Sequence, residues 1–220
     1  MKRAIVFGSS GFVGSHLLSN LLNSPDYGEV TAVARKGLNI THPKLRTLIG
    51  DYHSLAGVKS EIAADEVFIA LGTTKKNSPN EAQYYQVDHD YPVLAARIAK
   101  EGGAKAVFLV SAVDANPKSQ FFYVRTKGET ERDVIALNFE HTHIFRPSMI
   151  VGNRKEKRSL LEAALMRFWP ALNPLLTWKG GKYRGITGED IAKAMIKSAK
   201  NQTERVKIYH WSEMHDLLQR

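Results

Sequence analysis

Short apolar segments rich in β-branched and aromatic residues alternate along the chain with longer segments whose apolar residues recur at helical spacing. Strands are expected at residues 3–7, 30–34, 45–49, 66–70, 106–110 and 143–145. Helices are expected at 12–22, in a short stretch after Ser54, at about 81–101 and at about 121–137. Strands that alternate with helices favour right-handed crossovers and a parallel sheet covered on both faces. The pattern therefore predicts an α/β protein with a doubly wound parallel Rossmann sheet in the order 3-2-1-4-5-6.

The regular pattern loosens after Pro147. An apolar segment at 205–210 predicts a seventh strand, and the remaining expected elements are a basic loop at 153–159 and helices at 160–169, 188–200 and 212–219. The chain length fits one domain. We therefore expect residues 1–220 to form a single Rossmann domain, with residues 151–187 making most of a small cap on the substrate side.

The chain has no cysteine, which excludes disulfides and thiolate metal sites and fits a reducing compartment. The apolar stretch Ala4–Phe7 is too short for an export signal, and no apolar run approaches the roughly 20 residues that span a bilayer. The histidines show no H-x-x-x-H pair and no carboxylate partner at ligand spacing, so we expect no metal. These features favour a cytoplasmic protein with no membrane span, as a monomer or a homodimer.

The net charge of +9 is unevenly distributed, because residues 151–220 carry 14 Lys/Arg against 7 Asp/Glu. A basic region can attract nucleic acid, anionic lipid or an anionic substrate. These charges form no long run, however, and no aromatic–basic motif accompanies them. The simpler interpretation is a solvated surface that helps attract a phosphate-rich cofactor, and we expect no nucleic-acid partner.

The strongest motif is the run Gly8-Ser9-Ser10-Gly11-Phe12-Val13-Gly14, a G-x-x-G-x-x-G pattern between the first expected strand and the first expected helix. In this context the N–H groups of the helix point at a pyrophosphate. Gly8 permits the sharp turn, Gly11 lets the phosphates approach the backbone, and Gly14 lets the helix and the strand pack closely. All seven residues are therefore predicted to bind a dinucleotide.

The residue that follows the second strand bears on which dinucleotide binds. An acidic side chain there would bind the ribose 2′-hydroxyl of NAD, but this chain has Arg35 and Lys36. A guanidinium can form paired, charge-assisted hydrogen bonds with a 2′-phosphate. Arg35 therefore favours NADP(H), with Lys36 assisting; the alternative is that both side chains are merely solvated.

Two further strand ends are candidate cofactor contacts. Asp51 follows the third strand, where an adenine edge would lie, but it can equally be a turn or capping residue. Leu71, Gly72, Thr73 and Thr74 follow the fourth strand, where a glycine beside hydroxyl residues lets the backbone pass close to the ribose and diphosphate. An ordinary β-to-α turn is the alternative for this second segment.

Tyr123 and Lys127 are four residues apart and so share one helical face. Near a nicotinamide, a lysine ammonium stabilises tyrosinate and lowers the pKa of the phenol. Ser111 ends the fifth strand twelve residues earlier, where it can hydrogen-bond the same substrate oxygen. Such a pair is common on exposed helices, but together with Ser111 and the glycine motif it favours a catalytic set.

Several runs carry a family resemblance. Val110-Ser111-Ala112, the segment 122–129 and Phe145-Arg146-Pro147-Ser148 resemble the extended and atypical short-chain dehydrogenase/reductases. Three more runs are similar to the narrower Tat-interacting-protein oxidoreductase-like group and its small bacterial relatives: residues 87–91, 102–105 and 127–131. The similarity covers nearly the whole chain and is weakest across 153–185.

This resemblance implies a Rossmann fold, NADP(H) as cofactor, and Ser-Tyr-Lys chemistry at Ser111, Tyr123 and Lys127. It also implies that the loop containing Pro147 lies over the nicotinamide, with the backbone of Met149 nearby. One departure is Asp88, because many extended members have an asparagine there that supports a proton relay.

Two functions follow as hypotheses. The first is an NADP(H)-dependent oxidoreductase that acts on a small carbonyl or alcohol substrate of unidentified structure. The second is an NADP(H)-binding redox sensor or regulatory protein without significant turnover. The intact Ser-Tyr-Lys set favours the enzyme, whereas Asp88 and the short cap leave room for the sensor.

Overall fold

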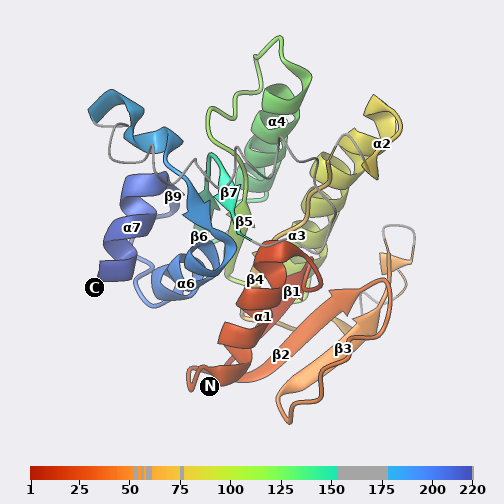
Figure 1. Ribbon diagram of the computed structural model, residues 1–220. Coiled ribbons are helices and arrows are strands. Elements are labelled where there is room, and N and C mark those ends of the chain that lie inside the picture. The colour runs from red at the N-terminus through yellow and green to blue at the C-terminus, as the bar shows by residue number, and fades with distance from the viewer. Residues whose placement is uncertain (52–53, 56, 58–60, 75–76, 153–177, 220) are drawn as a thin grey trace.

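The computed structural model describes residues 1–51, 54–55, 57, 61–74, 77–152 and 178–219, and it is built around a parallel sheet of seven strands (Figure 1). The strand order is β3-β2-β1-β4-β5-β6-β9, which confirms the predicted Rossmann sheet and its seventh strand. The strands are β1 (Lys2–Phe7), β2 (Tyr27–Ala34), β3 (Leu45–Ile49), β4 (Glu66–Ile69), β5 (Ala106–Val110), β6 (His141–Phe145) and β9 (Val206–Tyr209).

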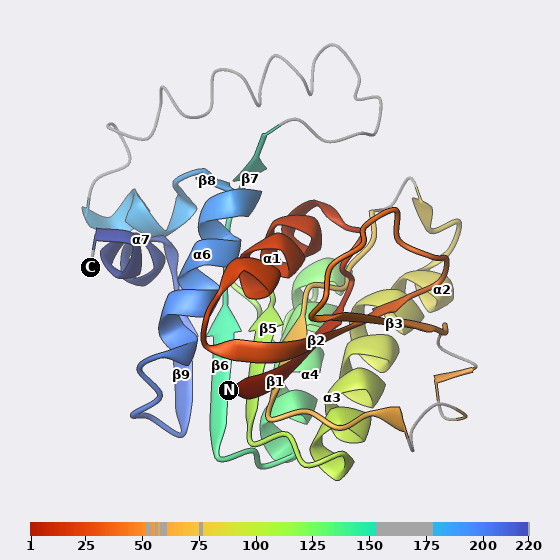
Figure 2. The ribbon, with the colours of Figure 1, turned by 90° about the horizontal axis from the view of Figure 1, so that it is seen from below.

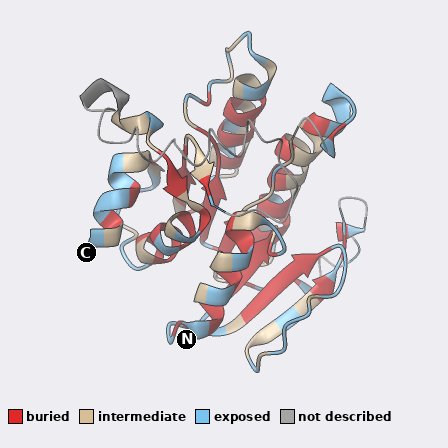
Figure 3. Ribbon diagram, in the orientation of Figure 1, coloured by how far each residue is buried: buried red, intermediate tan, exposed pale blue. Residues whose placement is uncertain are grey.

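Alternate residues of each central strand enter two separate hydrophobic cores, one on each face of the sheet. In β1, Ala4 and Val6 belong to one core and Ile5 and Phe7 to the other. Successive strand side chains point to opposite faces, so a strand covered on both sides is apolar throughout. The central strands are accordingly buried, whereas the edge strand β3 is largely accessible (Figure 3).

Helices cover both faces of the sheet (Figure 2). One layer contains α1 (Phe12–Asn23), α6 (Gly188–Ala199) and α7 (Trp211–Gln219), whose buried residues share a core. The other contains α3 (Tyr91–Glu101) and α4 (Phe122–Ala136). The loops after β1, β4, β5 and β6 all leave from the same side of the sheet, which we call the carboxyl edge; the opposite side is the amino edge. Ligands of open α/β sheets bind at the carboxyl edge.

The long helix predicted at about 81–101 is interrupted. It consists of α2 (Glu81–Tyr85), a π-helical turn at Gln86–Asp90, and α3. Pro92 explains part of this difference, because it lacks the N–H that an α-helix would direct at the carbonyl of Asp88. The hydroxyl of Thr130 on α4 lies within hydrogen-bond distance of that carbonyl, at 2.8 Å.

The chain after β6 forms a second, two-stranded parallel sheet. Here β7 (Ile150–Val151) pairs with β8 (Ile186–Thr187), and a 3₁₀ helix at Trp178–Tyr183 precedes β8. The predicted basic loop at 153–159 and helix at 160–169 lie outside the described residues, so the single-domain and cap boundaries stay predictions. Among the described helices, none combines the length and the apolar character needed to cross a bilayer.

Candidate functional site

The glycine turn between β1 and α1 is shaped by the backbone itself. Gly8 adopts a φ of +86°, and a Cβ there would lie 2.5 Å from the carbonyl oxygen of Ala70. A Cβ on Gly14, in the first turn of α1, would lie 2.0 Å from the carbonyl oxygen of Gly8. Any side chain at either position would therefore displace backbone, which explains the glycines at both ends of the motif.

The N-terminus of α1 leaves polar groups uncommitted. Its first residue follows Gly11, which supplies no capping side chain, and the first turn contains no acidic residue. The hydroxyl of Ser9 is buried and has no hydrogen-bond partner within the described part of the chain; the same is true of the Thr74 hydroxyl after β4. A helix N-terminus without a side-chain cap, next to buried hydroxyls that lack a protein partner, fits an anionic diphosphate. Ser10, between Ser9 and Gly11, is exposed.

Phe12 and Val13 pack within the protein. Val13 is buried in the core beneath α1. The ring of Phe12 occupies space left by two glycines, since a Cβ on Gly152 would lie 2.6 Å from it and a Cβ on Gly188 2.9 Å. These contacts join the glycine turn to the residues that flank the β7–β8 pair.

The residues predicted to select the cofactor lie at the ends of β2 and β3. Arg35 and Lys36 directly follow β2 and are both exposed. Asp51 follows β3, and its Oδ1 accepts hydrogen bonds from the backbone N–H and the hydroxyl of Ser54, at 2.9 and 2.8 Å. Both contacts are those of the capping residue that the sequence allowed at Asp51.

Tyr123 and Lys127 lie on successive turns of α4 near its N-terminal end. Lys127 is buried, and its ammonium forms an ion pair with the carboxylate of Asp88 at 2.6 Å. Tyr123 is 43% exposed, and its ring packs edge-on against Tyr84 of α2 with centroids 6.4 Å apart. A buried ammonium therefore lies one helical turn behind an accessible phenol.

Asp88 connects α4 to the loop after β4. Its side chain is 1% exposed; one oxygen contacts Lys127, and the other accepts the backbone N–H of Thr73 at 2.7 Å. Gly72 lies next to this pair, because a Cβ there would be 3.5 Å from Asp88 and 3.8 Å from Lys127. Burial alone would lower the pKa of Lys127, but Asp88, with smaller contributions from Tyr123 and Glu131, raises it. Lys127 is therefore a cation in the folded protein.

Ser111 lies directly after β5 and is buried. Its hydroxyl donates to Oε1 of Glu131 at 2.5 Å, and the guanidinium of Arg146 holds both oxygens of that carboxylate, with distances of 2.9 and 2.5 Å. Sequence reasoning missed Glu131 and the ion pair. The available signal was spacing, since Glu131 follows Tyr123 and Lys127 at the same four-residue interval on α4.

The loop after β6 runs beside the loop after β5. The carbonyl of Pro147 accepts the N–H of Val113 at 2.9 Å, and that of Met149 accepts the N–H of Ile186 at 3.0 Å. Pro147 and Met149 are therefore brought to the carboxyl edge near Ser111, although their proposed contact with a nicotinamide stays a prediction.

One further cluster lies beyond β5. Asp114 adopts a φ of 60°. Its carboxylate contacts the ammonium of Lys182 at 2.6 Å and the hydroxyl of Tyr183 at 2.7 Å. These hydrogen bonds hold the 3₁₀ helix that precedes β8 against the loop that follows Ser111. Asp114 had no sequence signal, because its partners are almost 70 residues away.

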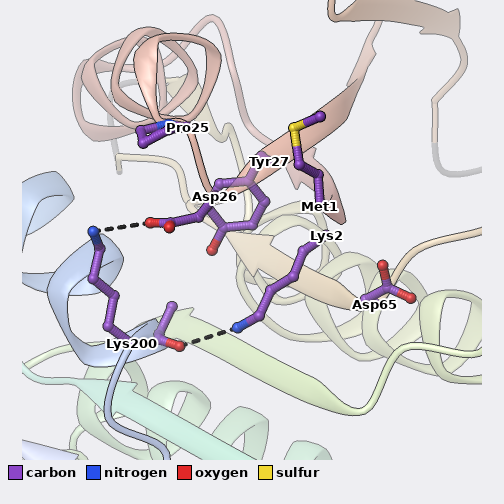
Figure 4. A pocket seen from close by; sticks show the side chains of 8 residues that line it. Met1, Lys2, Pro25, Asp26, Tyr27, Asp65 and Lys200 are labelled. Atoms are coloured by element: carbon purple, nitrogen blue, oxygen red, sulfur yellow. Dashed lines mark hydrogen bonds and ion pairs between the residues drawn. The ribbon is translucent and has the colours of Figure 1, made fainter.

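A hollow on the amino edge has a different character. It measures about 700 Å³ and is lined by residues that include Lys2, Asp26, Tyr27 and Lys200 (Figure 4). Its cations already have partners: Lys200 contacts Asp26 at 2.9 Å, and Lys2 contacts Glu66 at 2.6 Å. Both lysines of this hollow are therefore paired with carboxylates of the protein itself.

The model of the NAD dependent epimerase/dehydratase family matches residues 4–210. The chain belongs to this family. Two fungal proteins are close to it over most of their length. FMP52 of Candida albicans is 32% identical over 200 residues, covering 89% of this chain and 86% of its own, and FMP52-1 of Scheffersomyces stipitis is 30% identical over 223 residues, covering 97% of each.

Several solved structures share the fold. WbmH of Bordetella bronchiseptica, in complex with NAD+, gives a TM-score of 0.71 at 17% identity and covers 96% of this chain and 75% of its own. The UDP-N-acetylglucosamine 4-epimerase of Methanobrevibacter ruminantium M1 gives 0.70 at 20% identity, covering 95% of this chain and 76% of its own. Identities this low show the fold alone.

These findings correct one expectation and limit another. Both fungal relatives are named as mitochondrial proteins, so the predicted cytoplasmic location is wrong. That prediction depended on the lack of cysteine, which fits any reducing compartment and does not single out the cytoplasm. The resemblance to extended short-chain dehydrogenase/reductases is supported at the level of the family, but these relatives carry the name FMP52 and not that of the Tat-interacting-protein group.

Proposed function

We propose that this protein is an NADP(H)-dependent oxidoreductase of the short-chain dehydrogenase/reductase type that acts on a small carbonyl or alcohol. The observation that carries the proposal is the buried Lys127 ammonium one turn behind the accessible Tyr123, beside the loop after β4. The glycine turn, with the uncapped N-terminus of α1 and the buried Ser9 hydroxyl, lies at the same edge of the sheet. A proton-transfer group and a diphosphate cradle therefore serve one site.

The residues present fit a nicotinamide dinucleotide. The turn from Gly8 to Gly14 would hold the diphosphate, Leu71–Thr74 would contact the ribose and diphosphate, and Pro147 and Met149 would border the nicotinamide. Asp51 remains a candidate for the adenine edge. When bound, this cofactor gives a hydride to a carbonyl carbon or takes one from an alcohol carbon.

The side chains at the site supply the proton and position the substrate. Tyr123 donates its phenolic proton to the carbonyl oxygen during reduction and removes a proton from the alcohol during oxidation. Lys127 stabilises the tyrosinate left behind and would hold the nicotinamide ribose. Ser111 would hydrogen-bond the same substrate oxygen, which requires its hydroxyl to turn from Glu131 toward the substrate.

Arg35 supports NADP(H) over NAD(H), because a guanidinium can pair with the 2′-phosphate. Similar structures are described with NAD, so this preference needs its own test. Arg35→Ala should weaken NADPH binding at least ten-fold and change NADH binding by less than about two-fold, as measured by titration calorimetry. The control is Arg46→Ala, because Arg46 is a cation on the neighbouring strand β3 that pairs with Glu61. Equal losses for both nucleotides would remove Arg35 from the 2′-phosphate.

Turnover is tested by following NADPH oxidation over a panel of aldehydes, ketones and UDP-sugars. Tyr123→Phe should abolish any activity found, by at least 100-fold, because it removes the transferred proton. Tyr85→Phe, which removes a phenol that hydrogen-bonds Glu129, should retain activity. If neither NADPH nor NADH raises the melting temperature of the protein, the proposal fails.

A redox sensor without turnover is the second candidate. The specific observation in its favour is that the Ser111 hydroxyl is committed to Glu131 within a buried ion-pair network. NADPH binding without any Tyr123-dependent turnover across the panel would favour this second function.

A further inference from the structure

The carboxylate of Asp88 is matched to two donors at once. The ammonium of Lys127 and the backbone N–H of Thr73 approach different oxygens of the same side chain, at 2.6 and 2.7 Å. An asparagine, which has one acceptor and one donor group, would turn its NH₂ group toward one of these donors. A carboxylate therefore satisfies both donors, whereas an asparagine would satisfy one of them.

Three elements fix this carboxylate in place. The π-helical turn carries Asp88, and the loop after β4 donates the backbone N–H of Thr73 to its carboxylate. Helix α4 contributes the ammonium of Lys127, which contacts the carboxylate, and the hydroxyl of Thr130, which lies against the backbone carbonyl of Asp88. The side chain is almost completely shielded from water, so its charge acts on its neighbours with little screening.

The charged and titratable groups around the pair are few. Lys127 is faced by Asp88 from the π-helical turn and by Tyr123 and Glu131 from α4. Tyr84 of α2 lies against the ring of Tyr123. Glu131 is itself neutralised by Arg146, which directly follows β6, so Asp88 is the carboxylate that directly opposes the ammonium.

We propose that Asp88 is a positioning residue whose negative charge offsets that of Lys127 at Tyr123, so that the proton is held more firmly on the phenol than it would be beside Lys127 alone and the site favours carbonyl reduction. The inference rests on the proposed function. In the reductive step, the O–H bond of Tyr123 breaks and its proton joins the carbonyl oxygen. The carbonyl carbon accepts the hydride and both of its electrons from a reduced nicotinamide. Tyr123 then recovers a proton from water.

The test titrates Tyr123 directly, without a cofactor. Phenolate absorbance near 295 nm is followed against pH, and subtraction of the Tyr123→Phe curve isolates Tyr123 from the other tyrosines. In Asp88→Asn, the loss of the opposing charge should lower the pH at which Tyr123 ionises by about one to two units. Asp90→Asn is the matched control, since Asp90 lies on the same turn but contacts His89 and not Lys127.

Asp88→Glu preserves the charge and should keep the ionisation of Tyr123 within about half a unit of the wild type, which separates charge from shape. If Asp88→Asn does not fold, Asp88→Ser removes the charge while leaving room for a water between Lys127 and Thr73, and it takes the place of the asparagine variant. An unchanged or upward-shifted Tyr123 titration in the uncharged variant would overturn the inference.

A second readout distinguishes this inference from the proposed function. In the wild type, carbonyl reduction should lose rate at high pH as Tyr123 ionises, and Asp88→Asn should move that loss to lower pH by the same one to two units. If no nucleotide binds, the proposed function fails, and the titration still decides whether Asp88 controls the ionisation of Tyr123.

Discussion

The two edges of the sheet contain the same three kinds of side chain in different arrangements. On the amino edge, buried Glu66 accepts hydrogen bonds from Tyr27 at 2.5 Å, Lys2 at 2.6 Å and Gln202 at 2.5 Å. On the carboxyl edge, buried Asp88 contacts Lys127, which lies one helical turn from Tyr123 on α4. Each edge thus combines an acid, a lysine and a tyrosine.

The two tyrosines differ in the charge of the group beside them, and this difference decides how readily each one gives up its proton. Tyr27 is buried and donates directly to a carboxylate, so burial and Glu66 raise its pKa far above the usual value and its proton stays in place. Tyr123 is accessible and has a cation behind it. The amino edge satisfies its polar groups internally and serves stability, whereas the carboxyl edge presents an exposed tyrosine and, within the described residues, buried hydroxyls that have no hydrogen-bond partner.

The largest expected effect comes from closing the space at the carboxyl edge. Gly14→Ala places a Cβ 2.0 Å from the Gly8 carbonyl oxygen, so the turn must shift. We expect a loss of about 3 kcal/mol in unfolding free energy and no detectable nucleotide binding, measured by urea denaturation and thermal shift with NADPH. Gly37→Ala, where the added Cβ meets nothing within 4 Å, is the control. If Gly14→Ala binds nucleotide as tightly as the wild type, the glycine turn does not hold the diphosphate.

Glu66→Gln should break the amino edge alone. The amide leaves the buried Tyr27 hydroxyl and the half-exposed Lys2 ammonium with a neutral partner, at a cost of about 2 kcal/mol in unfolding free energy. Nucleotide affinity should change by less than about two-fold once the folded fraction is taken into account.

Glu61→Gln, which removes an exposed carboxylate paired with Arg46, should cost less than about 1 kcal/mol and serves as the control. A selective loss of NADPH binding in Glu66→Gln would show that the two edges are not independent.

The smallest effect is expected at the rim of the amino-edge hollow. The hydrogen bond from Lys200 lowers the pKa of Asp26. A lowered folded-state pKa means that the contribution is present above the unfolded pKa and lost as pH falls through the folded one. Asp26→Asn should therefore cost less than about 1 kcal/mol at pH 7, with the difference from wild type shrinking below about pH 4. Urea denaturation at pH 7, 4 and 2.5 measures it, and a difference that persists at pH 2.5 would contradict the assignment.

The sheet order and the glycine turn could be predicted because their signals are local. Alternating apolar segments define the strands, and the geometry that requires Gly8 and Gly14 arises within one strand–turn–helix unit. The pairing of Asp88 with Lys127 could not be predicted, because it depends on how the π-helical turn packs on α4. Pro92 was a local signal of that turn, but it did not reveal which residue would face α4.

Ser111 illustrates a second limit. Its place after β5 followed from the strand pattern, yet the direction of its hydroxyl depends on Glu131 and Arg146, which come from two other elements. The predicted cytoplasmic location was wrong for a different reason: the lack of cysteine excludes disulfides but does not distinguish one reducing compartment from another.

The β7–β8 pair has a consequence for how this protein can be altered. Val151 and Thr187 are neighbours in register. The residues that follow them, Gly152 and Gly188, both contact the ring of Phe12, so the C-terminal ends of both strands pack against the glycine turn. Chain inserted between two such fixed ends can lengthen cheaply, since each doubling adds only about 0.6 kcal/mol of closure entropy. We therefore expect connecting segments of different length between these two strands to change the unfolding free energy little, provided that the contacts of Lys182 and Tyr183 with Asp114 are kept.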